Sequence, residues 1–138
     1  MDQKLELLKR VPLFAGLEPD ELEEIARIAE EMDAPAGTEL THEGRHEGYF
    51  FVIVSGTVRV ERGGQTVNTL HDGDFLGEIS LLDGGPRTAT TTAEAPSTLI
   101  VMTHQRFSQL LGASPAIRRA VMEEVGRRLR RLDAEMAF

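Results

Sequence analysis

The sequence of 138 residues contains no cysteine, which excludes disulfides, thiolate metal sites and a cysteine nucleophile. Its apolar runs, such as Tyr49–Val54, fall far short of the ~18 residues that a membrane-spanning helix needs. Met1–Arg10 mixes charged residues with leucines and lacks the apolar core of a signal peptide. These absences predict one globular domain without a membrane span, in a reducing cytoplasm.

Positive charge is also scarce, because the chain carries a net charge of −8. Such a balance argues against a general nucleic-acid binder, which needs a basic face. An anionic ligand would therefore need positive groups gathered locally. We interpret most of the charges as solvated helix faces. Six of the basic residues nevertheless lie close together near the end: Arg118, Arg119, Arg127, Arg128, Arg130 and Arg131.

Apolar residues recur at helical spacing at both ends of the chain. Pro19 is a typical first residue of a helix, and Asp20 and Glu21 in its first turn suit the helix dipole. The predicted helices are Leu5–Lys9, Pro19 to about Met32, His104–Leu111 and a final helix from Ser114 or Pro115 nearly to the end.

The middle of the chain has the period of two that is typical of strands, with glycine at the turns. The pair Gly63-Gly64 indicates a hairpin. Many short strands separated by glycine turns favour a small roll or barrel over βαβ units. The predicted strands are Tyr49–Val54, Thr57–Glu61, Gln65–Leu70 and Ser97–Thr103.

Strand alternation fails between Gly73 and Thr90, where Gly-Glu-Ile-Ser-Leu-Leu predicts one short helix. A helix N-terminus offers unpaired N–H groups to a phosphate. Arg87 follows after a tight turn and could bind two phosphate oxygens with its planar fork. The carboxylate of Glu78 would repel a phosphate but suits a ribose hydroxyl. The residues thus indicate a phosphate-plus-sugar site, and an ordinary helical crossover with a surface Arg–Glu pair remains the alternative.

The pattern Phe-x-Gly-Glu-x-x-Leu-Leu-x-x-x-Pro-Arg-Thr-Ala-Thr, over Phe75–Thr90, resembles the phosphate-binding cassette of cyclic nucleotide-binding domains. That family includes cAMP receptor transcription factors, kinase regulatory subunits and gated channels. Leu8–Leu17 is similar to the family's opening segment, and Gly44–Gly56 to its central strands. The resemblance covers nearly the whole chain.

The resemblance implies an α+β fold. Its centre is a β-roll, a jelly-roll-like antiparallel barrel, with short N-terminal helices, an inserted cassette helix, and hinge and lid helices at the C-terminal end. The expected division of the single domain 1–138 is helices in 1–32, the roll in 33–103 with the cassette at 73–90, and hinge and lid in 104–138.

The resemblance also implies roles for individual residues. Gly77 would let the backbone approach the ribose, and Glu78 would accept a hydrogen bond from its 2′-hydroxyl. The amides of Ile79 and Ser80 would hold the cyclic phosphate, and Arg87 would neutralise it. Three further positions have lesser expected roles: Thr88 as a hydroxyl donor, and Leu76 and Val67 in the apolar wall around the base.

The sequence defines the base of the bound nucleotide less clearly than its phosphate and sugar. Thr88 after the arginine is compatible with cGMP or cAMP, and we favour cAMP because the small domains that this chain resembles mostly bind it. Where the receptor transcription factors carry a Thr-Ser pair that touches adenine, this chain has Leu132 and Asp133. Arg128 or Arg131 of the lid helix could reach the base instead, or both could be solvated.

Two enzyme-like readings find little support. His42 and His46 lie four apart, but no His-x-His pair exists and the other two histidines, His71 and His104, are remote, so no metal is expected. No serine has the surroundings of a nucleophile elbow. We therefore expect no catalysis and no cofactor other than the nucleotide ligand.

The remaining alternative is a docking module that keeps the fold and acts through its basic final helix. That helix could bind an acidic effector protein or pair with a second copy. Only seven residues follow Arg131, too few for a helix-turn-helix, so DNA binding by this chain alone is not expected. A cyclic nucleotide sensor that moves its lid helix and signals to a partner remains the preferred interpretation.

Overall fold

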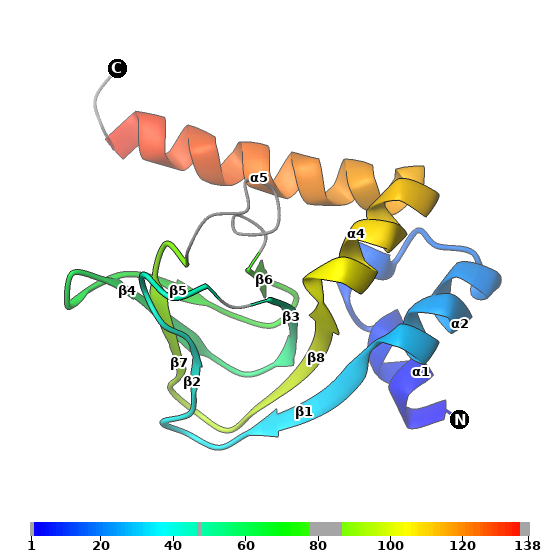
Figure 1. The fold of residues 1–138 in the computed structure, drawn as a ribbon, viewed down its shortest axis with the longest axis horizontal. Helices are drawn as coiled ribbons and strands as arrows, with labels where there is room; N and C mark the ends of the chain where they lie inside the picture. Colours follow the sequence, from blue (N-terminus) through cyan, green and yellow to red (C-terminus); the bar gives the residue numbers. More distant parts are fainter. Residues whose placement is uncertain (1, 47, 78–86, 136–138) are drawn as a thin grey trace.

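The computed structural model describes residues 2–46, 48–77 and 87–135, with the backbone alone for residues 2, 128, 129 and 131–135. Two four-stranded antiparallel sheets form a roll, and helices gather at one end of it (Figure 1). The α+β class and the β-roll predicted from the sequence are confirmed.

The first sheet has the strand order β1-β8-β3-β6 and the second the order β2-β7-β4-β5. The strands are β1 Glu30–Ala34, β2 Glu39–Thr41, β3 Tyr49–Ser55, β4 Val58–Arg62, β5 Gln65–Leu70, β6 Phe75–Leu76, β7 Thr90–Ala93 and β8 Ser97–Thr103. The helices are α1 Asp2–Lys9, the 3-10 turn η1 Pro12–Phe14, α2 Pro19–Ile28, α4 His104–Ala113 and α5 Pro115–Glu135.

The apolar sequence of strand β3 follows from its position in the fold, because both of its faces are covered. Phe50, Val52 and Val54 face a cluster built with the helices, whereas Phe51 and Ile53 face the second sheet across the roll. Side chains alternate between the two faces of a strand, so a strand buried on both sides reads as an unbroken apolar run. This strand therefore separates two cores.

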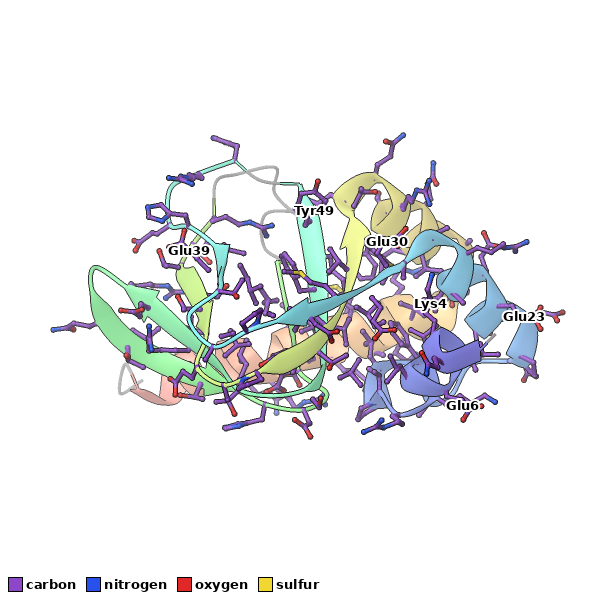
Figure 2. All side chains as sticks on the ribbon, turned by 90° about the horizontal axis from the view of Figure 1, so that it is seen from below. Lys4, Glu6, Glu23, Glu30, Glu39 and Tyr49 are labelled. Carbon is purple, nitrogen blue, oxygen red and sulfur yellow. The ribbon has the colours of Figure 1, made fainter. Side chains whose placement is uncertain are left out.

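The helical core contains side chains from every described helix. Leu8 of α1, Ile25 of α2, Phe107 of α4 and Val121 of α5 all belong to the cluster that covers β3. Lys4 adds a polar tie, because its ammonium donates to the carbonyls of Ala26 and Ala29 at the end of α2, and Figure 2 shows this lysine between α1 and α2. A cation at a helix C-terminus also suits the helix dipole.

The N-terminal boundary differs from the prediction. Helix α2 ends at Ile28, not near Met32, and β1 begins at Glu30. Glu30 to Ala34 pair residue by residue with β8, so strand pairing decides the conformation of a segment whose local composition favours a helix. Three short strands, β2, β6 and β7, were not predicted.

The hairpin at Gly63-Gly64 is present as predicted. Both glycines have positive φ, +57° and +80°, as a two-residue turn of the type favoured in hairpins requires. It joins β4 to β5, which pair in antiparallel register.

The two C-terminal helices meet at Ser114. Helix α4 packs beside β8, and α5 then runs as a long helix from the helical end across the roll (Figure 1). The hydroxyl of Ser114 accepts from the amide of Ile117 at 3.3 Å and donates to Glu21 of α2 at 2.8 Å. The junction between the expected hinge and lid is thus anchored to the N-terminal helices.

Candidate functional site

The site begins at Gly77, directly after β6. Its φ is +97°, a conformation that residues with a Cβ rarely adopt. A Cβ built there would lie 2.6 Å from the carbonyl oxygen of Tyr49 and 2.8 Å from Nη1 of Arg87. Glycine is therefore required twice, for the backbone conformation and for the close approach of the guanidinium.

Arg87 is the buried cation of the site, with 4% of its surface exposed. Its Nη2 donates to the Tyr49 carbonyl at 2.6 Å. Burying a permanent positive charge is costly unless polar or anionic groups compensate it. In a chain with a net charge of −8, this guanidinium is a local positive centre of the kind an anion needs.

The backbone of Arg87 is fixed by the loop that connects β2 to β3. Its amide donates to the carbonyl of Arg45 at 2.8 Å, and its carbonyl accepts from the amide of Gly44 at 3.0 Å. Tyr49 lies at the start of β3, opposite Thr103 in the pairing with β8, and Figure 2 shows it beside the first turn of α4. Arg87 is thus held through its main chain by Gly44 and Arg45 and through its side chain by Tyr49.

The segment after Arg87 is tied to the second sheet. Arg62 donates from Nε to the carbonyl of Thr88 at 3.1 Å. Thr41 donates to the carbonyl of Ala89 at 3.0 Å and is 2.8 Å from the hydroxyl of Thr91. Thr88 itself is exposed, next to the buried arginine.

The sequence analysis missed His104, the first residue of α4. Its Nε2 lies 3.1 Å from the carbonyl oxygen of Gly77, so the two groups form a hydrogen bond across 27 positions of the chain. Partial burial and the charge of Arg87 lower the pKa of His104 below its ordinary value of 6.5, whereas hydrogen bonds to the carbonyls of Gly77 and Tyr49 act in the opposite direction. The sequence offered one signal: a histidine at the junction of a predicted strand and a predicted helix.

The two residues predicted to form the apolar wall around the base lie in different surroundings. Leu76 is buried among the side chains between the two sheets, directly before Gly77. Val67 is 52% exposed on β5. A base contact for either residue stays a prediction.

The remaining predicted site residues lie outside what the structure describes. Glu78, Ile79 and Ser80, with the rest of the predicted cassette helix, fall within residues 78–86. For Arg128 and Arg131 the structure describes the backbone of α5 but not the side chains. Of the predicted residues, the structure therefore brings together Gly77 and Arg87, with Leu76 and Thr88 next to them in the chain.

Two structural features are absent from the described residues: a membrane-spanning helix and a cluster of metal ligands. No helix among them is long and apolar enough to cross a membrane. In the same part of the chain, no three His, Asp or Glu side chains gather as a metal site would require.

Comparison with protein families gives one match: residues 31–114 match the model described as "Cyclic nucleotide-binding domain". The match includes all of the roll except Glu30, the first residue of β1, and it includes Gly77, Arg87 and His104. It ends at Ser114, where α4 meets α5.

Three curated proteins illustrate the range of relatives. A CRP-like cAMP-activated global transcriptional regulator of Mycobacterium tuberculosis is 28% identical over 96% of this chain. A cyclic AMP receptor protein of Thermus thermophilus is 31% identical over 94% of the chain. A cGMP-dependent protein kinase of Caenorhabditis briggsae is 31% identical over 85%. The chain spans 61%, 62% and 17% of the lengths of these relatives.

A solved structure of the catabolite activator protein of Thermus thermophilus has a similar fold. The TM-score is 0.78 at 30% identity, and the alignment covers 91% of this chain and 61% of that one.

Proposed function

The chain belongs to the cyclic nucleotide-binding domain family, and from that premise we propose that it is a non-enzymatic sensor of a cyclic nucleotide, with cAMP as the preferred ligand. The observation that carries this proposal is the buried guanidinium of Arg87, held 2.6 Å from the Tyr49 carbonyl beside a glycine that has no room for a Cβ. Charge-assisted bonds from an arginine fork suit two oxygens of a phosphate.

The rest of the binding mode follows the sequence prediction. Gly77 provides the close backbone approach, and Glu78 accepts from the ribose 2′-hydroxyl. The amides of Ile79 and Ser80 complete the phosphate site at a helix N-terminus. In this binding mode Glu78 acts only as a hydrogen-bond acceptor, so the proposal includes no chemical step on the nucleotide.

The proposal favours cAMP because two of the bacterial relatives are named for it. The cGMP-dependent kinase among the relatives keeps cGMP as the second candidate, and a threonine at position 88 is compatible with either nucleotide. Arg128 and Arg131 of α5 are the side chains proposed to meet the base.

Binding is proposed to act by shifting the position of α5 relative to the roll. Helix α5 is joined to the site through α4, whose first residue, His104, contacts Gly77. An effector protein would then recognise the altered position of α5. A location in the cytoplasm, expected from the sequence, stays a prediction.

A docking module without ligand is the second candidate, and one observation favours it. On α5, Met122 is 53% exposed, and Arg118, Arg119 and Arg127 are exposed as well. An exposed apolar residue among arginines suits an acidic partner surface or a second copy of the chain. This candidate predicts that α5 binds its partner even when no nucleotide occupies the cassette.

Calorimetric titration separates the two candidates. The chain is titrated with cAMP, cGMP and 5′-AMP, where 5′-AMP is the control that keeps the base and sugar but has an open phosphate. The sensor proposal predicts saturable binding of cAMP or cGMP in the micromolar range or tighter, a free energy of about −8 kcal/mol, and much weaker binding of 5′-AMP. Absence of heat with both cyclic nucleotides would reject the sensor and favour the docking module.

A further inference from the structure

A single hydrogen bond joins the start of the cassette to the start of α4. The Nε2 of His104 lies 3.1 Å from the carbonyl oxygen of Gly77, and that carbonyl belongs to the peptide bond through which the chain enters residues 78–86. The amide of His104 donates in turn to the carbonyl of Gly48 at 2.8 Å. His104 therefore contacts both sides of the site, the entry to the cassette and the loop before β3.

The same helix face contacts the neighbouring strand. Residues three apart lie on one side of a helix, so Phe107 follows His104 on the face that meets β3. Its ring stacks on Phe50 with centroids 3.8 Å apart and planes inclined by 10°. The Cα of Phe50 would lie 3.3 Å from a Cβ at Gly77, so His104 contacts Gly77 directly and Phe107 packs on the strand residue whose backbone adjoins the same glycine.

Arg87 brings a permanent charge to this arrangement. Gly77 contacts both partners: its carbonyl meets the imidazole, and a Cβ there would be 2.8 Å from Nη1 of the guanidinium. Burial of the ring and repulsion by Arg87 both lower the pKa of His104. The neutral imidazole therefore predominates in the free protein near neutral pH and donates its Nε2–H to Gly77.

The groups around the imidazole come from three elements. Arg87 lies in the second half of the cassette, and the carbonyls of Gly77 and Tyr49 come from the ends of β6 and β3. On α4 itself, Arg106 points to solvent and its amide donates to Thr103, the N-cap residue. The phenol of Tyr49 and the ring of His46 are exposed, and Glu78 lies outside the described residues.

We propose that His104 is a positioning residue that couples nucleotide binding at Arg87 to the uptake of one proton and to the attachment of α4 at the cassette. The inference rests on the proposed function, because it requires an anion at the guanidinium. The bound phosphate offsets the positive charge that repels a second cation, so the imidazolium becomes easier to form. Its stronger hydrogen bond to Gly77 then holds α4 more firmly.

The sign of the pH dependence follows by linkage. The pKa of His104 is low in the free protein and higher in the complex, so binding takes up a proton between these two values. Affinity must then rise as pH falls through that window and level off on either side. Because the free pKa lies below 6.5, the window falls around and below that pH.

The test measures the Kd of cAMP by calorimetry at about pH 5.5 and about pH 8, a range that spans histidine titration. The wild-type chain, His104→Gln and His71→Gln are compared, where His71 is an exposed histidine before β6. Wild type and His71→Gln should bind roughly twofold or more tightly at the lower pH; a pKa rise of about half a unit has a limit of about threefold, reached only below both pKa values. His104→Gln should show no such change, because its amide donates to Gly77 but does not titrate.

Two further measurements check the positioning role directly. His104→Phe, which has no donor, should weaken binding at both pH values. In the wild-type chain, the pKa of His104 followed by NMR should rise when cAMP saturates the site.

Each alternative result has a distinct meaning. A pH-independent Kd in the wild type, the wild-type slope in His104→Gln, or wild-type affinity in His104→Phe would overturn the inference while leaving the sensor intact. Failure of cAMP and cGMP to bind at either pH would instead reject the proposed function, and the proton coupling with it.

Discussion

At the helical end of the molecule, the side chains that cover β3 form an apolar cluster from Leu8 to Val121, and Ser114 is a buried polar residue beside it. Across the same strand, the roll buries Thr41, Thr91 and the cation of Arg87. An apolar core maximises stability, because every buried side chain adds to it. Buried polar groups contribute little net stability and are costly when they lose a partner. The difference predicts that the helical core contributes most to stability, whereas the polar groups buried in the roll serve the proposed ligand.

The two regions meet at a few residues. Tyr49 and Phe50 of β3 face His104 and Phe107 of α4, through the Tyr49 carbonyl and the stacked rings. If the division is correct, substitutions on the helical side should change stability with little direct effect on the ligand. Substitutions at the cassette should do the reverse.

The largest effect on stability is expected for Phe107→Ala. This ring is fully buried and stacks on Phe50, so its removal leaves a cavity and costs ~3–5 kcal/mol of unfolding free energy. Urea unfolding followed by circular dichroism measures the loss. Met122→Ala is the control, because Met122 is half-exposed on α5 and should change stability by less than ~0.5 kcal/mol. Equal losses in both variants would contradict the assignment of Phe107 to the core.

Gly77→Ala is expected to act mainly on binding. The added Cβ would overlap the Tyr49 carbonyl and displace the guanidinium, and a loss of binding free energy equal to the strain of about 1–3 kcal/mol corresponds to a roughly fivefold or greater rise in the Kd of cAMP. Gly37→Ala is a matched control, because Gly37 has a similar φ of +91° but open space around its Cβ. It should lose some stability and keep the wild-type Kd. An unchanged Kd of cAMP in Gly77→Ala would contradict the role of this glycine in the site.

The smallest effect is expected for Ser114→Ala. The hydroxyl of Ser114 is buried and bonds to both Ile117 and Glu21, so its loss should cost ~1 kcal/mol through the helix cap. Chemical denaturation measures it, with the exposed Ser108→Ala of α4 as control. Because Ser114 lies at the helical end, the Kd of cAMP should stay nearly constant. A large change in Kd would show that the two regions are coupled through this junction.

The sequence predicted the elements whose patterns are locally strong. The strands Gln65–Leu70 and Ser97–Thr103 occur with the predicted bounds, and Pro19 begins α2 as expected. The end of α2 was wrong, because Glu30 to Ala34 become a strand only through pairing with β8. That partner lies some seventy positions away and leaves no local signal.

Prediction of the site residues was limited in the same way, because a contact between residues far apart in the chain leaves no local signal. Gly77 and Arg87 could be predicted because they belong to one short motif, and the structure brings them together. His104 could not, since its contact with Gly77 spans 27 positions and a lone histidine is common at protein surfaces. Leu76 was expected to line the site, and its side chain lies within the core between the sheets.

The most direct test compares the Kd of cAMP for the wild-type chain with that for Arg87→Ala. Arg27→Ala, at an exposed position of α2, is the control, and thermal unfolding verifies that each variant is folded. A desolvated charge contact with the phosphate predicts a loss of ~2–5 kcal/mol for Arg87→Ala, which is thirtyfold or more in Kd, and no loss for Arg27→Ala. A folded Arg87→Ala protein that binds cAMP as tightly as the wild type would contradict the central claim that this buried guanidinium is the seat of the anion.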